Sequence, residues 1–232
     1  MAITNESQAT GGEDSPSIED LKALVPATKN SQERIVTKED LLSRIYTLPA
    51  NFGRVFRAAV KSNPNNPLAT QLYIVCRNSE SKLTNAPDTL KENLKKYLNP
   101  YRLINDAIDI LDSPIVNLSF NFDIVVDPSL NQQTVLQSIL NLLITQFQTT
   151  KFSIDQPIVI SDIQNTIFSV PGVLSIVNTE FKSMNGLVNN RQYSNIAFDP
   201  KLNYRRGILY PPDGGIFEIR YPEVDIVGRT AM

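Results

Sequence analysis

The stretch of residues 114–183 constrains the fold more than any other part of the chain, because its hydrophobic pattern changes period within it. In its first part, every second residue from Val116 to Ile124 is apolar and the residues between them are polar. A period of two is typical of a β-strand that buries one face. Asp127 and Pro128 end this predicted strand, since proline cannot donate to a sheet ladder.

A helical period follows. Residues 132–147 place apolar side chains three and four positions apart, which predicts an amphipathic helix with a broad apolar face. A shorter helix is predicted over 161–170, after which Pro171 and Gly172 turn the chain into a strand over 173–181. This order predicts a two-layer unit with two helices on one face of a sheet. The apolar helix positions are Val135, Leu136, Ile139, Leu140, Leu142, Leu143 and Phe147.

The residues before this stretch predict a second unit of the same class. Strands are predicted over 54–61 and 71–77, and a helix over 89–98. Residues 101–111 predict a strand, with a helix as the competing interpretation. Two short helices are predicted before residue 50, one beginning at Ser17 and one at Thr37, each with an Asp three residues later as in a capping box.

Residues 184–232 differ in character, because they are rich in Asn, Tyr, Pro and Gly and show few helical patterns. The segment 207–221 predicts a β-hairpin, since two apolar runs flank a turn that contains Asp213 and Gly214. Residues 224–227 predict a last strand at a sheet edge or in an arm. With so little apolar core of its own, this segment is expected to pack on the two units or on another subunit.

The sequence therefore predicts the α+β class. We expect two small two-layer α/β sandwich modules with antiparallel or mixed sheets, followed by a β-rich, irregular C-terminal tail. The predicted divisions are 1–50 for an N-terminal arm and short helices, 51–112 for the first module, 113–183 for the second module, and 184–232 for a β-hairpin tail that makes subunit contacts.

Composition narrows the possible functions. The chain of 232 residues contains no histidine, which excludes Ser-His and Cys-His catalysis and the usual zinc sites. A net charge of -2 argues against a nucleic acid or an anionic membrane as partner. The sequence also lacks the glycine-rich phosphate-binding motifs and any apolar run long enough to span a bilayer. We expect a protein that is not an enzyme and that uses neither a cofactor nor a metal.

Two groups of charged residues are candidates for a site. Asp106, Asp109 and Asp112 recur every three residues, a spacing that does not bring three carboxylates to one cation. Lys201 and its neighbouring arginines are too few for a nucleic-acid groove, so a set of interface contacts is favoured. Aromatic and cationic residues of the tail are the predicted interface. They are Tyr193, Phe198, Tyr204, Arg205, Arg206 and Tyr210.

Residues 10–183 contain a series of turns and caps in a particular order. A Gly-Gly-x-Asp segment at Gly11, Gly12 and Asp14 precedes a predicted helix, and a Val-Thr-x-x-Asp segment follows at Val36, Thr37 and Asp40. Later come the strand-ending Asp127 and the turn at Pro171, Gly172 and Val173. In this order and spacing the residues resemble the baseplate J-like proteins, which are wedge proteins of contractile phage tails, and the later block is similar to the family's C-terminal module. The tail is more similar to T4-type baseplate wedge proteins.

The resemblance implies a structural subunit of the wedge, in the inner ring around the tail hub, that acts by protein–protein assembly. Its implied partners are a second copy of itself, in a homodimer within the ring, and other baseplate wedge proteins, with no membrane and no nucleic acid. The implied location is the baseplate of the virion tail, assembled in the host cytoplasm. Known members carry a longer N-terminal region, so a fragment, a split gene product and a minimal version all stay open.

Two other functions compete. A polysaccharide- or nucleic-acid-binding module of similar α+β build would need an exposed aromatic or basic groove. An enzyme that uses only Asp, Glu and Lys chemistry would need a cleft holding two carboxylates with displaced pKa values.

Overall fold

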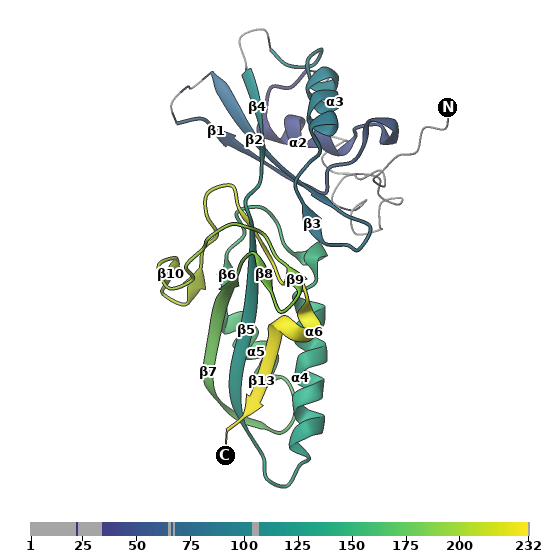
Figure 1. Ribbon diagram of the computed structural model, residues 1–232. Coiled ribbons are helices and arrows are strands. Elements are labelled where there is room, and N and C mark those ends of the chain that lie inside the picture. The colour runs from purple at the N-terminus through teal and green to yellow at the C-terminus, as the bar shows by residue number, and fades with distance from the viewer. Residues whose placement is uncertain (1–21, 23–33, 65, 67, 104–106, 232) are drawn as a thin grey trace, which may run out of the picture. The chain divides into compact units, whose positions relative to one another are not determined.

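The computed structural model describes residues 22, 34–64, 66, 68–103 and 107–231, and the chain divides into two compact units, Met1–Ser113 and Pro114–Met232. Each unit combines helices with antiparallel or mixed sheets (Figure 1), which confirms the predicted α+β class. Among the described residues, the helices are all too short or too polar to cross a membrane.

The first unit is built around a central strand, β2 (Ala69–Arg77). Strand β1 (Arg57–Ser62) pairs with it antiparallel, and β4 (Ala107–Asp112) pairs with its first six residues in parallel. The short strand β3 (Leu83–Thr84) pairs antiparallel with its last two residues. Such a mixed sheet was one of the two arrangements expected from the sequence.

Two helices pack on this sheet. They are α2 (Lys38–Tyr46), against β1, and α3 (Asp88–Leu98), against β4, and the 3₁₀ turn η1 (Ala50–Phe52) lies against α3. Apolar side chains from both helices and from β2 meet in one core, which is the main source of stability for a unit of this size. The core residues are Ile35, Leu41, Ile45, Leu48, Val55, Leu72, Ile74, Cys76, Ala86, Leu90, Leu94 and Leu98.

The start of α2 shows how local sequence determines this unit. The Thr37 hydroxyl accepts a hydrogen bond from the Asp40 N–H at 3.1 Å, and the Asp40 carboxylate accepts one from the Thr37 N–H at 2.9 Å. This is the predicted capping box, and it is confirmed. Except for Lys22, the helix predicted to begin at Ser17 lies outside the described residues, as do Gly11 and Gly12.

The second unit is built around β5 (Ile115–Val126), in which nine of the twelve residues are buried. On one edge it pairs antiparallel with β7 (Val173–Met184). On the other edge it pairs in parallel first with β12 (Ile216–Glu218) and then with β13 (Ile226–Thr230). Figure 1 shows β5 between β7 and β13. The sheet of this unit is therefore completed by the last residues of the chain.

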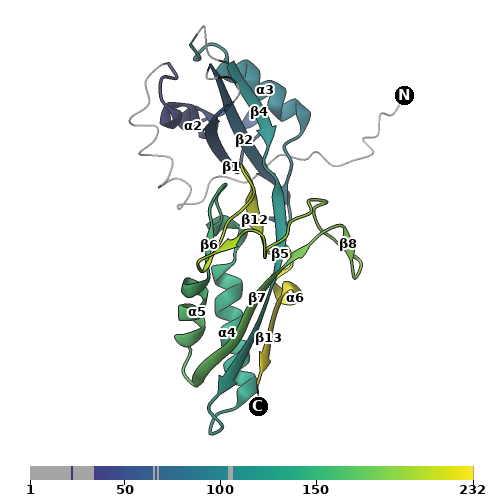
Figure 2. The same cartoon turned by 90° about the vertical axis from the view of Figure 1, so that its left-hand side faces the viewer.

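The helices α4 (Gln132–Gln146) and α5 (Ile160–Phe168) lie on the same face of this sheet (Figure 2), as predicted. The burial of the apolar positions in β5 is confirmed, because the apolar residues from Val116 to Ile124 are at most 1% exposed. The prediction that only one face of this strand is buried is wrong for its first half, because Asn117 and Ser119 on the other face are buried as well. The Phe120 ring lies 4.8 Å from Phe181 and 5.8 Å from Phe147, centroid to centroid, which joins β5, β7 and the end of α4 in one aromatic core.

Short elements complete the second unit. Strands β10 and β11 form a small sheet with β6, and β8 pairs with β9. These elements are η2 (Thr149–Lys151), β6 (Ile158–Val159), β8 (Leu187–Val188), β9 (Arg191–Gln192), β10 (Tyr204–Arg205), β11 (Ile208–Leu209) and α6 (Pro222–Asp225).

The strand predicted over 101–111 is wrong in its first part. The Tyr101 N–H donates to the Leu98 carbonyl at 3.0 Å, so the chain still turns at the end of α3. The Tyr101 ring packs 5.6 Å from Tyr97 and carries the Arg44 guanidinium 4.2 Å from its centroid. These tertiary contacts override the β preference of the sequence, and the strand begins only at Ala107.

The hairpin predicted over 207–221 is also wrong, because the residues on either side of the 211–215 turn pair with different strands. Strand β11 pairs with β10 around a two-residue turn, in which Arg206 and Gly207 have positive φ values of 51° and 84°. Strand β12 pairs instead with β5. The Asp213-Gly214 segment makes a contact outside the predicted hairpin, because the Gly214 N–H donates to Asp155 Oδ1 at 2.8 Å.

The last predicted strand is shifted. Val224 and Asp225 belong to α6, and the strand begins at Ile226 and lies at the sheet edge. The turn that carries part of the family resemblance does form, since the Val173 N–H donates to the Val170 carbonyl at 3.4 Å across Pro171 and Gly172. Gly172 has a φ of 99°, a conformation that favours glycine.

Gly228 gives a test of this architecture, because β13 passes very close to the core at this residue. A Cβ atom there would lie 2.4 Å from Phe122 Cζ and 2.6 Å from Leu136 Cδ1. We expect Gly228→Ala to lower the free energy of unfolding by about 1–3 kcal/mol, the usual cost of overpacking a core. Denaturant unfolding measures this change. The exposed neighbour Val227 supplies the control, and equal stability of Gly228→Ala and Val227→Ala would contradict the parallel pairing of β13.

Candidate functional site

A buried polar cluster joins the C-terminal segment to β5. Asn117 is 1% exposed; its Nδ2 donates to Glu218 Oε2 at 2.7 Å and its Oδ1 accepts from the Ser194 N–H at 2.6 Å. The Ser194 hydroxyl donates to the Ile115 carbonyl at 2.6 Å, and Arg220 Nη1 lies 3.2 Å from Glu218 Oε2. Because Asn117 and Glu218 are each 1% exposed, the hydrogen bonds that they make offset a desolvation cost that would otherwise oppose folding.

A second buried pair lies in the same segment. The Tyr193 hydroxyl donates to Asp225 Oδ1 at 2.7 Å, and the Tyr221 N–H donates to Asp225 Oδ2 at 2.9 Å. Burial raises the pKa of Asp225, while the hydrogen bonds from Tyr193 and Tyr221 act in the opposite direction. Burial and the hydrogen bond to Asp225 raise the pKa of Tyr193 above its usual value of 10. We call the two groups together the polar latch: Asn117, Tyr193, Ser194, Glu218, Arg220 and Asp225.

The polar latch holds chain segments together by hydrogen bonds. Its carboxylates accept hydrogen bonds from groups of the same unit. In the first unit, the Asp112 carboxylate likewise pairs with Lys91 Nζ at 2.7 Å, which raises the pKa of Lys91. Asp109 lies on the same strand, and Asp106 is outside the described residues. Within the described part of the chain, acidic and cysteine residues form no cluster of three or more that could hold a metal ion.

The predicted interface residues separate into two groups. Tyr193 is buried in the polar latch, and Phe198 is half-buried with its ring edge-to-face against Phe217 at 5.6 Å. The others are exposed and lie together on or beside the β10–β11 hairpin, with Leu202, which is 76% exposed, next to them. We call this group the hairpin surface. It consists of Leu202, Tyr204, Arg205, Arg206 and Tyr210, and its role in subunit contacts stays a prediction.

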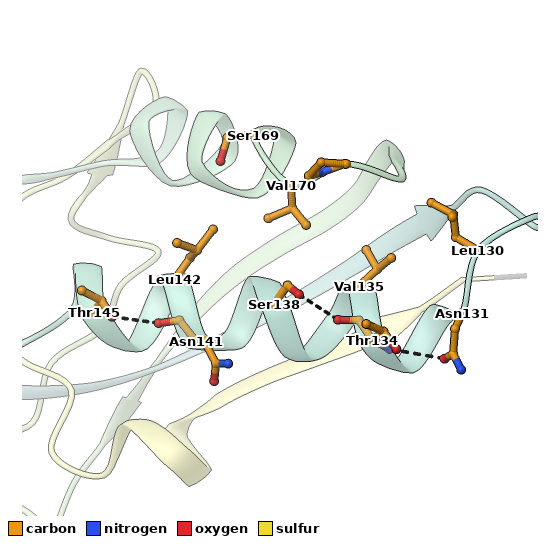
Figure 3. A pocket seen from close by; sticks show the side chains of 11 residues that line it. Leu130, Asn131, Thr134, Val135, Ser138, Asn141, Leu142, Thr145, Ser169 and Val170 are labelled. Carbon is orange, nitrogen blue, oxygen red and sulfur yellow. Dashed lines mark hydrogen bonds between the residues drawn. The ribbon is translucent and has the colours of Figure 1, made fainter.

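The sequence did not reveal an open groove between α4 and the end of α5. Its volume is about 830 Å³, and Figure 3 shows Leu130, Val135 and Leu142 facing Val170 across it. The sequence predicted that Leu142 would belong to the buried face of the helix, but its side chain is 44% exposed. The lining residues are Leu130, Asn131, Thr134, Val135, Ser138, Asn141, Leu142, Thr145, Ser169, Val170 and Pro171.

One sequence signal could have revealed the groove, namely the absence of charge. No ionisable residue occurs from Pro128 to Thr150, although 20% of the chain is charged. An exposed helix of a soluble domain usually carries charges on its outer face, as α3 does with its lysines. A long helix that is partly exposed and lacks charge therefore points to a surface that another molecule covers.

No protein-family model matches the chain, and the search of curated proteins also found no match. Among solved structures, the chain is similar to a chain in a cryo-EM structure of the anti-feeding prophage (AFP) baseplate, six-fold symmetrised, with a TM-score of 0.51 and 9% sequence identity. The match covers 72% of this chain and 37% of that chain, so this chain spans little more than a third of its length. At this identity the likeness is one of fold.

The polar latch predicts a specific loss of stability. Tyr193→Phe keeps the ring but removes the hydroxyl that donates to Asp225, which leaves a buried carboxylate oxygen without that donor. We expect the free energy of unfolding to fall by about 1–3 kcal/mol at neutral pH. Denaturant unfolding measures the change. Tyr210→Phe is the matched control, since Tyr210 is 44% exposed, and the prediction fails if both variants lose the same small amount.

The pH dependence gives a second check on the same variant. A tyrosine whose folded pKa is raised stabilises the protein fully below its unfolded pKa, and this contribution is lost as pH rises. We therefore expect the stability difference between the wild type and Tyr193→Phe to narrow above pH 10, the ordinary value for this group. A difference that stays constant through that range would show that the hydroxyl is not buried.

Proposed function

We propose that this chain is a structural subunit of a contractile-tail baseplate and that it acts by protein–protein assembly. The observation that carries the proposal is the fold likeness to a chain of the anti-feeding prophage baseplate, over 72% of this chain. The order and spacing of the turns and caps in residues 10–183, which resemble the baseplate J-like family, support it independently.

The surfaces of the second unit favour an assembly role over a catalytic one. The hairpin surface exposes two tyrosine rings, one leucine and two arginines, residue types that are enriched or tolerated in protein interfaces. The groove beside α4 adds exposed leucine side chains. The buried carboxylates of the polar latch serve the fold, which leaves the exposed surfaces as the part available to partners.

At a finer level, we propose that the chain belongs to the wedge and contributes to the inner ring around the tail hub. Its partners there would be a second copy, in a homodimer within the ring, and other wedge proteins. The location would be the tail baseplate of a virion that assembles in the host cytoplasm.

The decisive experiment locates the chain in a particle. We expect an epitope-tagged chain to co-purify with contractile tail particles and to appear in the baseplate by cryo-electron microscopy. Particles that lack the chain, or that carry it in the sheath or the tube, would overturn the proposal. Untagged particles serve as the control for the position of the tag.

The hairpin surface gives a prediction for point variants. We expect Tyr204→Ser combined with Tyr210→Ser to leave the free energy of unfolding within about 0.5 kcal/mol, because both rings are largely exposed. The same variant should lose co-purification with the neighbouring tail proteins, since exposed aromatic rings often dominate binding energy. Val224→Ser, which alters an apolar side chain 42% exposed on α6, is the control.

Two results would contradict this prediction. Unchanged co-purification of the double variant would exclude the hairpin surface from the interface. Binding of a polysaccharide or an oligonucleotide by the wild type, lost when Lys201, Arg205 and Arg206 are all replaced by Gln, would favour the competing binding-module function.

A further inference from the structure

The groove beside α4 is bounded by two segments without charge. Ionisable residues are absent from Pro128 to Thr150 and again from Ile163 to Thr179, two runs of 23 and 17 residues. Both runs lie in the second unit and supply all the residues that line the groove. A charged occupant would lose its hydration there without gaining an opposite charge, which is unfavourable. The groove therefore selects a neutral surface.

Three of the four hydroxyl groups along the groove, those of Ser138, Thr145 and Ser169, are directed to their own helices. Ser138 Oγ donates to the Thr134 carbonyl at 2.9 Å, and Thr145 Oγ1 donates to the Asn141 carbonyl at the same distance. On the opposite wall, Ser169 Oγ donates to the Thr166 carbonyl at 2.7 Å. Figure 3 marks the two bonds on α4 with dashed lines, and a further dashed line joins Thr134 to Asn131 at the start of the helix. These groups therefore present mainly carbon atoms to an occupant, and the groove is more apolar than its sequence suggests.

Apolar side chains complete the groove. Val135 and Val170 are 7% and 6% exposed and form its floor, whereas Leu130 and Leu142 are each 44% exposed at its sides (Figure 3). Burying such partly exposed side chains on binding contributes about 25 cal/mol for each Å² of apolar area. The groove thus offers hydrophobic binding energy and few hydrogen-bond partners.

We propose that this groove docks an α-helix of a partner protein, through an uncharged ridge of large aliphatic side chains. An extended segment would bury its backbone N–H and C=O groups in a groove that has few groups to pair with them, at about 1–3 kcal/mol for each unpaired group. A helix pairs these groups internally and adds no such cost. The inference deepens the proposed function and rests on it, because the partner would be another baseplate subunit.

The size of the groove residues specifies the partner further. Thr134, Ser138, Asn141 and Thr145 are spaced by four, three and four positions, so they lie along one stripe of α4. Small residues on one helix accept large side chains from its neighbour, as knobs enter holes. The α4 helix of a second copy would bring the same small residues and only one exposed large aliphatic side chain of the lining, Leu142, so it would fill the stripe less completely and lose dispersion contacts. The occupant is therefore a different helix, with large aliphatic residues along its ridge.

The test uses the full chain and a defined probe. The probe is a synthetic helical peptide of about five turns, with leucines at successive i, i+3 and i+4 positions and alternating Glu and Lys on its other face. Fluorescence anisotropy of the labelled peptide measures its affinity for the wild type. We expect Ser138→Glu to weaken binding at least about tenfold, which is the effect of 1.4 kcal/mol.

The matched control is Gln133→Glu. It adds the same charge to an exposed position of the same helix, outside the groove lining, and should change the affinity less than about twofold. Leu142→Gln is a second groove variant, in case the first one unfolds, and should also weaken binding. Thermal unfolding of each variant establishes that it is folded.

Several results would overturn the inference: no binding of the peptide by the wild type, equal binding by Ser138→Glu, or equal binding of a peptide whose helix is broken by proline. Self-association that Ser138→Glu abolishes would assign the groove to a second copy and would also overturn it. Particle incorporation separates the two proposals. Normal incorporation of Ser138→Glu with no peptide binding refutes only the groove, whereas peptide binding by a chain that is absent from tail particles refutes only the baseplate function.

Discussion

The second unit depends on the need of one strand, β5, for partners on both edges and cover on both faces. Its residues from Ile115 to Phe120 are all buried, so their backbone N–H and C=O groups need hydrogen-bond partners within the protein. Strand β7 satisfies one edge, and β12 and β13 satisfy the other. The polar latch then covers the face of β5 that carries Asn117 (Figure 2 shows α6 on the side of the sheet away from α4).

The need of β5 for partners from distant parts of the chain explains which parts of the fold could be predicted from the sequence. The capping box at Thr37, the strand β5 with its buried apolar positions and the helix α4 are encoded within a few residues of sequence, and each was predicted correctly. The parallel pairing of β12 and β13 with β5 joins residues about a hundred positions apart, as in Phe217 with Val116, and no local pattern specifies it. The Asp213-Gly214 turn signal therefore predicted a hairpin, but the residues that follow the turn pair with the distant strand β5 instead.

The residues of the candidate site also divide into those that local sequence predicts and those whose position depends on long-range contacts. The exposure of Tyr204 and Tyr210 follows from a local hairpin, although its turn lies at Arg206 and Gly207. Tyr193 looked equally suitable for an interface in the sequence, yet its hydroxyl is needed by Asp225 in the interior. Only the tertiary structure separates an aromatic residue that supports the fold from one that is available to a partner. The absence of charge along α4 was visible in the sequence, but it has structural meaning only once α4 is known to be partly exposed.

The C-terminal segment combines a role in the fold with the surface proposed for assembly, and truncation cannot separate the two. It supplies β12, β13 and most of the polar latch to the interior, and it also carries the hairpin surface. Removing residues 184–232 would leave one edge of β5 without its backbone partners and Asn117 without Glu218, so the remaining unit would lose stability whatever the segment does in assembly. Because the exposed rings of the hairpin do not take part in this support, substitutions there change the surface and leave the sheet intact. Assembly can thus be examined apart from folding only at single side chains.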